Sequence, residues 1–150
     1  MRLAVLALCA CAPDLTYETR HGIEVFDTVG QYIVTEIELA TELLIEHGGR
    51  GRKVLPGLQV RFQGDEVTIG GCSKPGAYYP NLSLAVVQTL SHCLAATAFI
   101  HELAHHLEWK LDEEIDYGHT GEPWQPGGFV REAERQANDA LCVGLRSDGE

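Results

Sequence analysis

The residues His101-Glu102-Leu103-Ala104-His105 constrain this 150-residue chain more than any other segment. On an α-helix, side chains four residues apart lie one above the other on the same face, so His101 and His105 can reach one metal ion together. Glu102 lies to the side of that pair, where a carboxylate can accept a proton from a zinc-bound water. The HExxH spacing therefore predicts a helix, a zinc ion held by the two histidines, and Glu102 as general base.

The same segment has a simpler interpretation, which is the solvated polar face of an amphipathic helix. The apolar residues Ile100, Leu103 and Leu107 argue against it, because they give the helix faces that can pack on a core. A catalytic zinc also needs three protein ligands and one open position. The metal interpretation therefore requires a third ligand elsewhere in the chain.

Two residues downstream of the motif are candidates for this third ligand. Glu134 belongs to the last expected helix, and a helix holds a carboxylate rigidly. Ala133 and Ala137 are small enough to let that helix approach the HExxH helix closely. His119 follows His105 in a loop rich in glycine and proline. The sequence favours Glu134 as the ligand, and His119 is the alternative, either as a ligand or as a hydrogen-bond donor to a developing oxyanion.

The segment Glu134-x-x-Ala137-Asn138 resembles the glutamate motif of ImmA/IrrE-type metallopeptidases, which are minimal gluzincins. This resemblance implies that the two motif histidines and Glu134 bind zinc and that Glu102 is the base. The chain departs from these families at Ala140, where they often carry an aromatic residue.

The stretch from His101 to Trp124 resembles a second family, the SprT-like metalloproteases. In that family a Gly-His-Gly-x-x-aromatic segment follows HExxH, and its histidine is the third ligand. The resemblance implies this role for His119 in Gly118-His119-Thr120, although Thr120 replaces the second glycine of the motif.

The rest of the sequence predicts an α+β domain of zincin-like architecture. Apolar residues at three- and four-residue steps predict helices over 27–47, from 89 or 91 to 110, and over 129–145. Alternation of apolar and polar residues predicts strands over 58–62 and 67–69, joined as a hairpin, and over 77–87. Pro80 makes part of this last segment an edge strand. The order of helix, small mostly antiparallel sheet, HExxH helix and glutamate helix resembles the minimal gluzincins.

An apolar segment over residues 1–13 precedes the expected single domain over 14–150. It resembles a secretory signal with Ala10-Cys11-Ala12 as the cleavage site, but it is shorter than the usual 15–30 residues. The alternative is a strand or arm packed on the core. The five cysteines include no CxxC pair, which favours buried thiols in a reducing compartment, so we expect a cytoplasmic protein.

The net charge is −11, and the only basic cluster is Arg50, Arg52 and Lys53. Binding to nucleic acid or to an anionic membrane needs a larger surface of lysine and arginine, so we expect neither partner. The apolar segment at the N-terminus is also too short to span a bilayer as a helix. The expected partner is a peptide or protein substrate.

These observations predict a zinc-dependent metallopeptidase in which Glu102 activates a zinc-bound water for hydrolysis of a peptide bond. The alternative is a catalytically silent zinc-binding module with a regulatory or protein-interaction role. Tyr78 and Tyr79 are expected either to flank a bound peptide or to pack on the sheet. His106 is expected at the surface or beside a metal ligand rather than as a ligand itself, and Trp124 is expected to be hydrophobic packing.

Overall fold

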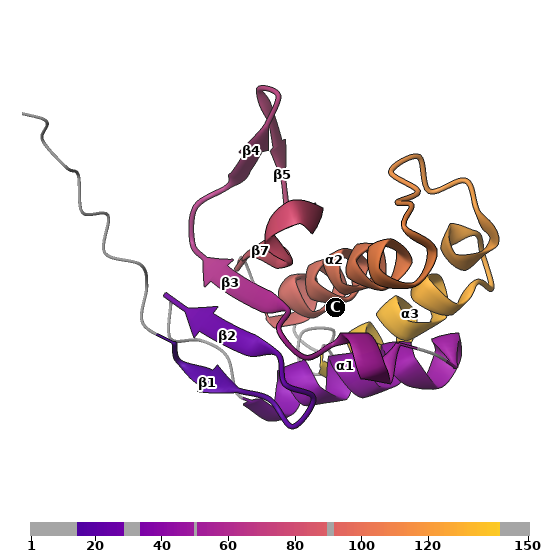
Figure 1. Cartoon of the computed structure of the whole chain (residues 1–150), viewed down its shortest axis with the longest axis horizontal. Helices are drawn as coiled ribbons and strands as arrows, with labels where there is room; N and C mark the ends of the chain where they lie inside the picture. The colour runs from indigo at the N-terminus through magenta and orange to yellow at the C-terminus, as the bar shows by residue number, and fades with distance from the viewer. Residues whose placement is uncertain (1–14, 29–33, 50, 90–91, 142–150) are drawn as a thin grey trace, which may run out of the picture.

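The computed structural model describes residues 15–28, 34–49, 51–89 and 92–141, without the side chains of 34 and 92–96 (Figure 1). Its strands are β1 (Tyr17–Glu18), β2 (Glu24–Asp27), β3 (Gln59–Gln63), β4 (Val67–Ile69), β5 (Cys72–Lys74), β6 (Gly76–Tyr79) and β7 (Leu84–Gln88). Its α-helices are α1 (Val34–Gly48), α2 (His92–Asp112) and α3 (Phe129–Leu141). Short 3-10 turns cover Arg52–Val54, Pro80–Leu82 and Glu122–Trp124. The expected α+β class is confirmed, whereas the apolar segment over 1–13 lies outside the described residues.

The main sheet has the strand order β1-β2-β3-β7-β6. Its inner pairs, β2–β3 and β3–β7, are parallel, and its outer pairs, β1–β2 and β6–β7, are antiparallel. The strands β4 and β5 form a separate antiparallel hairpin that projects from the body of the molecule (Figure 1). Antiparallel pairs therefore outnumber parallel ones among the described strands, as expected, but the main sheet is mixed.

The expected hairpin of 58–62 with 67–69 is wrong. The strand β3 pairs with β2 and β7, both in parallel, and β4 pairs with β5 instead. Val60 and Phe62 on β3 are fully buried, which is typical of a strand in the middle of a sheet. The alternation of residues indicates a strand, but it does not identify the strand's partner. The expected edge strand is confirmed for β6, which ends the sheet after Pro80 separates it from β7.

The first helix is expected from residue 27, but Asp27 is the last residue of β2, and α1 is described from Val34 to Gly48. Residues 29–33 of the expected helix lie outside the described part of the chain. Val25 is fully buried in β2, where a β-branched side chain packs well. The last helix begins at Phe129 as expected and ends at Leu141, so residues 142–145 lie outside the described part of the chain.

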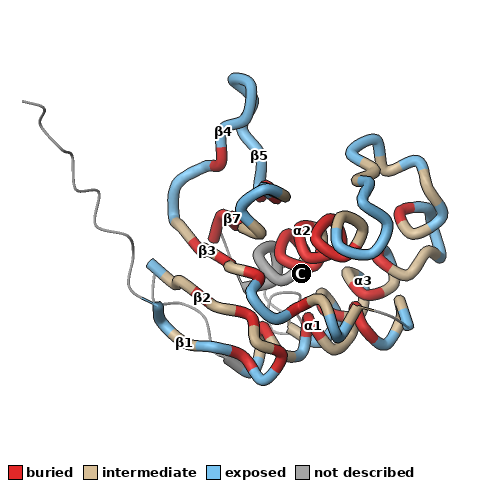
Figure 2. Tube along the Cα trace, viewed as in Figure 1, coloured by how far each residue is buried: buried red, intermediate tan, exposed pale blue. Residues whose placement is uncertain are grey.

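Helix α2 occupies the centre of the molecule, because it contacts β6 and β7 of the sheet as well as α1 and α3. Residues Glu102 to Leu107 are all buried, and α2 is the most continuously buried helix in Figure 2. Phe99 of α2 meets Phe62 of the sheet with ring centroids 6.2 Å apart. A helix surrounded in this way holds its side chains in fixed positions. Among the described residues, no helix is long and apolar enough to cross a membrane.

Candidate metal centre

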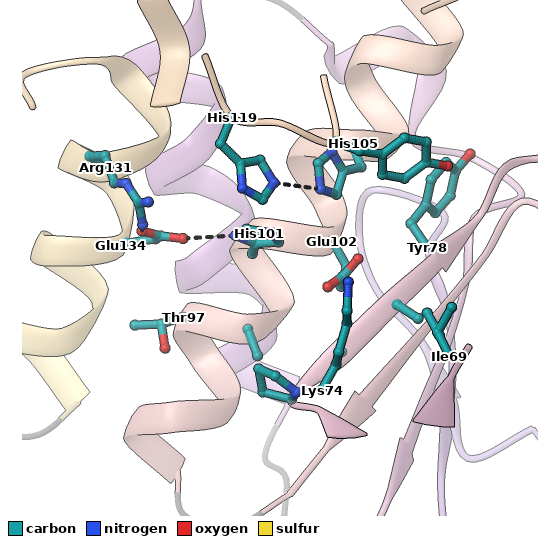
Figure 3. A pocket seen from close by; sticks show the side chains of 15 residues that line it. Ile69, Lys74, Tyr78, Thr97, His101, Glu102, His105, His119, Arg131 and Glu134 are labelled. Carbon is teal, nitrogen blue, oxygen red and sulfur yellow. Dashed lines mark hydrogen bonds and ion pairs between the residues drawn. The ribbon is translucent and has the colours of Figure 1, made fainter. Parts of the chain in front are cut away.

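Three histidines meet at one point above α2. His101 and His105 lie one turn apart on the helix, with ring centroids 4.9 Å apart. His119 reaches them from the loop between α2 and α3, and its Nε2 lies 3.2 Å from Nε2 of His105 (Figure 3). One ligand atom from each of the three residues falls within 4.8 Å of the others. The three histidines are therefore close enough to bind one metal ion.

The distance between the nitrogens of His105 and His119 is close to that in a zinc site. Zn–N bonds of about 2.0–2.1 Å at a tetrahedral angle place two ligand atoms roughly 3.4 Å apart. The separation of 3.2 Å between His105 and His119 is close to this value. Two neutral imidazoles can also share a hydrogen bond at such a distance. A hydrogen bond between His105 and His119 does not account for the third histidine, His101, whereas a shared metal ion accounts for all three. Burial, and then the neighbouring His101 and His105, lower the pKa of His119, which favours the neutral ring that binds metal.

The loop that carries His119 is organised by Asp116. The Asp116 carboxylate accepts hydrogen bonds from the backbone N–H of Gly121 at 2.6 Å and from the Thr120 hydroxyl at 3.5 Å. The bond from Gly121 is the main reason that the pKa of Asp116 lies below its usual range. The side chain of Gln125 donates to the backbone carbonyls of His119 and Thr120 on the other side of the loop. His119 itself has φ 53, a left-handed conformation that a non-glycine residue adopts only when its surroundings hold it there.

Glu108 fixes the orientation of His105. Its carboxylate lies 3.1 Å from Nδ1 of His105, so a proton on Nδ1 leaves Nε2 free to face the other histidines. The indole N–H of Trp124 donates to Glu108 at 2.7 Å, and the backbone N–H of Asp116 donates to it at 3.2 Å. Glu108 therefore joins the helix to the loop that carries the third histidine. Trp124 does more than fill hydrophobic space, because it holds this carboxylate and its ring also contacts all three histidines.

Glu134 bears the same relation to His101. Its carboxylate lies 3.5 Å from Nδ1 of His101, and Arg131 donates to it at 2.8 Å. Burial opposes ionisation of Glu134, but the bonds from His101 and Arg131 outweigh it and keep its pKa below the usual value. The cluster of possible ligand atoms includes His119 and not Glu134. Of the two candidates from the sequence, the geometry thus favours His119, while Glu134 contacts the side of His101 that faces away from the cluster (Figure 3).

The expected general base is buried beside the histidines. Glu102 is only 5% exposed, and this burial raises its pKa to about 7, although His101 and Lys74 act in the opposite direction. Strand β6 passes close to it, because a Cβ on Gly76 would lie 2.7 Å from Oε1 of Glu102. A side chain at position 76 would therefore displace the carboxylate of Glu102, which lies between the sheet and its own helix.

A cleft of about 430 Å³ lies in front of these groups. One wall comes from the β4–β5 hairpin and β6, with Ile69, Lys74 and Gly76. The other wall comes from α3 and the loop before it, with Arg131 and Tyr117. The three histidines and Glu102 all line this cleft, so a molecule bound there would reach them.

His106 is not at the surface. It is fully buried, its Nε2–H donates to the carbonyl of Val54 at 2.8 Å, and its Nδ1 accepts from the Tyr78 hydroxyl at 2.9 Å. Burial is the main cause that lowers the pKa of His106, which is consistent with a neutral ring using both nitrogens. Tyr78 is buried against the cleft by this bond, whereas Tyr79 is exposed and is not part of the cleft wall.

The sequence does not single out the supporting residues Glu108 and Asp116. Glu108 lies three residues after His105, a spacing that puts both side chains on one helix face. Asp116 precedes a short loop with glycines, where aspartate often accepts backbone hydrogen bonds. Both signals are common in helices and loops that bind no metal.

Comparison with protein-family models, with curated proteins and with solved structures gives no match.

Proposed function

We propose that this protein is a zinc-dependent metallopeptidase with His101, His105 and His119 as its zinc ligands. The observation that carries the proposal is the meeting of three histidine nitrogens within 4.8 Å beside a buried glutamate, all at the wall of one cleft. Three histidines leave one position open for water or substrate, which is the arrangement of catalytic rather than structural zinc sites. Imidazole ligands also suit zinc better than they suit magnesium or calcium.

The chemistry divides between the ion and the chain. When bound, zinc lowers the pKa of water to about 7 and polarises a substrate carbonyl. Glu102 accepts the proton of the attacking water and then passes it to the leaving amine. A carboxyl whose pKa is about 7 suits both steps, because it can hold or release a proton near neutral pH. Glu108 and Glu134 orient the rings of His105 and His101 through Nδ1.

A peptide is the substrate that this cleft fits best. Strand β6 is the last strand of the sheet and also lines the cleft, so one of its edges has no strand partner among the described residues. An extended peptide can add to such an edge through its own backbone, which places a peptide bond beside Glu102. Of the two families that the sequence resembles, the SprT-like one has the histidine in the third position, and this geometry therefore supports it over the gluzincin arrangement.

The experiment is a comparison of zinc content and peptide cleavage in the wild type and in Glu102→Gln. We expect about one zinc per chain in both proteins, and cleavage of a mixed peptide library by the wild type alone. Glu46→Gln is the matched control, because Glu46 is exposed on α1 and does not line the cleft, and it should cleave like the wild type.

The outcomes separate the two functions that the sequence left open. Zinc without cleavage in the wild type would support the silent zinc-binding module and reject the peptidase. A protein that takes up no zinc even after reconstitution would reject both functions. Equal cleavage by Glu102→Gln and the wild type would reject Glu102 as the base.

A further inference from the structure

The cleft carries two cationic side chains in a chain whose net charge is −11. Lys74 ends β5 on one wall, and Arg131 lies on α3 in the other. Cations at the mouth of a cleft attract anionic groups more strongly than cations on an open surface, because the walls exclude water. Both side chains are therefore candidates for contact with a charged group of the substrate.

Arg131 already makes hydrogen bonds within the protein. Its Nε–H donates to the carbonyl of Trp124 at 3.1 Å, and its Nη1 donates to Glu134 at 2.8 Å. The guanidinium therefore supports the carboxylate that orients His101, and its charge is balanced by Glu134. A substrate carboxylate at Arg131 would compete with this pair.

Lys74 is in a different situation. Its side chain lines the cleft and extends toward Glu102 (Figure 3). The side chain makes no hydrogen bond or ion pair with the residues that the structure describes. Its effect on Glu102 is electrostatic, because its positive charge lowers the pKa of that carboxyl. An ammonium group has three donors, and those of Lys74 are available to a bound molecule.

The chain after Lys74 holds it in place at the cleft. The carbonyl of Pro75 accepts a hydrogen bond from the backbone N–H of Gln88 at 2.8 Å, which ties the end of the hairpin to β7. Gly76 has no side chain that could stand between Lys74 and the cleft beside Glu102. Ile69 of β4 lines the same wall of the cleft, and Lys74 itself is exposed, so a molecule in the cleft can reach it.

We propose that Lys74 determines the specificity of this site by binding a carboxylate group of the peptide substrate. The inference rests on the proposed peptidase function and adds the chemical class of its substrate. The carboxylate can come from an aspartate or glutamate side chain near the scissile bond, or from the C-terminus of the peptide. The position of Lys74 next to the base places that carboxylate within a few residues of the bond that is cut.

The first test measures kcat/KM on matched peptides. One set carries a single aspartate at successive positions and has an amidated C-terminus, a second set has asparagine at the same positions, and a third is neutral with a free C-terminus. We expect at least a tenfold preference for either the aspartate set or the free C-terminus, which identifies the source of the carboxylate. Equal cleavage of all three sets would overturn the inference while leaving the peptidase proposal intact.

The second test reverses the charge. Lys74→Glu should lose the preference for carboxylates and gain one for the same peptides with lysine, a reversal that partial unfolding cannot imitate. Lys53→Glu makes the same change of charge at an exposed residue outside the cleft and should keep the wild-type preference. An unchanged preference in Lys74→Glu would overturn the assignment.

A binding measurement separates this inference from the failure of catalysis. Zinc-loaded Glu102→Gln should bind a fluorescent aspartate peptide at least tenfold more tightly than its asparagine counterpart, as measured by anisotropy. The same measurement in Glu102→Gln/Lys74→Met should show no difference between the two peptides. A protein that cleaves nothing but shows this difference would refute the peptidase proposal and support the carboxylate site, whereas equal affinities would refute the site.

Discussion

The three histidines are held by two very different parts of the molecule. His101 and His105 project from α2, whose backbone hydrogen bonds and surrounding core fix their positions. His119 projects from an exposed loop, where its position depends on Asp116, on Gln125 and on a left-handed backbone conformation. The helix would hold its pair in the same place without a metal, but the loop has few buried contacts of its own.

This difference shows how a site can combine a rigid half with an adjustable half. The helix sets the distance between the two proposed ligands His101 and His105, because side chains four residues apart lie on the same face. The loop brings in His119, the proposed third ligand. Glu108 connects the two parts, because it contacts His105 of the helix and accepts a hydrogen bond from the backbone N–H of Asp116. Metal binding should therefore stabilise the loop much more than it stabilises α2.

The largest expected effect separates the two candidates for the third ligand. His119→Ala should lose stoichiometric zinc, because two histidines of one helix do not complete a site. Glu134→Gln should keep its zinc with roughly 10–100-fold lower affinity, because it removes only the charge that orients His101. Zinc content by elemental analysis, followed by competition with a chelator, measures both effects.

The opposite result would change the site. Loss of zinc in Glu134→Gln together with normal zinc in His119→Ala would make the helix α3 the source of the third ligand. The resemblance to the ImmA/IrrE-type families would then be the correct one. Circular dichroism of both variants shows whether zinc loss arises from unfolding.

The second expected effect concerns Glu102 on α2, which should make the stability of the protein depend on pH. The pKa of Glu102 is about 7 in the folded protein against an ordinary value of 4.5. Between these two values the unfolded chain releases this proton and the folded protein keeps it, so the free energy of unfolding falls as pH rises through this range. The loss levels off above pH 7, and its full size is about 3 kcal/mol.

Urea unfolding of metal-free wild type and Glu102→Gln between pH 4 and pH 9 measures this loss. The charges of His101 and Lys74 lower the pKa of Glu102, and both residues are present in both proteins. The difference between the two unfolding curves therefore isolates the carboxyl group. A difference that stays constant with pH would show that Glu102 is solvated in the folded protein.

The smallest expected effects concern protein stability around α2 and zinc affinity in the loop that carries His119. Tyr78→Phe leaves Nδ1 of the buried His106 without a donor, so it should lower the free energy of unfolding by roughly 1–3 kcal/mol. Asp116→Ala removes the acceptor for Gly121 from an exposed loop, so it should weaken zinc binding while Tm in the absence of metal stays close to the wild type. Thermal unfolding and zinc titration of both variants make the comparison. An unchanged zinc affinity in Asp116→Ala would show that the loop does not need this residue to present His119.

The sequence predicts the parts of this fold that depend on local periodicity. Helices α2 and α3 follow from apolar residues at helical spacing, and the pair His101 and His105 follows from the same geometry. The partners of β3 could not be predicted, because they come from segments before and after it in the chain. The sequence does not predict the strand β2 and places Asp27 at its end in a helix, because β2 is stabilised by its pairing with β3, far away in the sequence.

The candidate site divides in the same way. Glu134 and His119 both come close to His101, and only the three-dimensional arrangement shows that Glu134 approaches Nδ1 of that ring while the ring of His119 packs edge-on against it. The burial of His106 also depends on tertiary structure. Helix α2 is covered by α1, α3 and the sheet, whereas the spacing of apolar residues predicts only one buried face of a helix. Sequence spacing thus identifies candidate ligands, whereas their roles depend on contacts between elements.

The absence of a side chain at position 76 has a consequence for how such a protein could change its role. A methyl group there would push the carboxylate of Glu102 aside and leave every histidine untouched. The substitution Gly76→Ala would then separate metal binding from hydrolysis in the proposed site. If the proposed peptidase function holds, Gly76→Ala would give a protein that still binds metal and no longer has its general base in position.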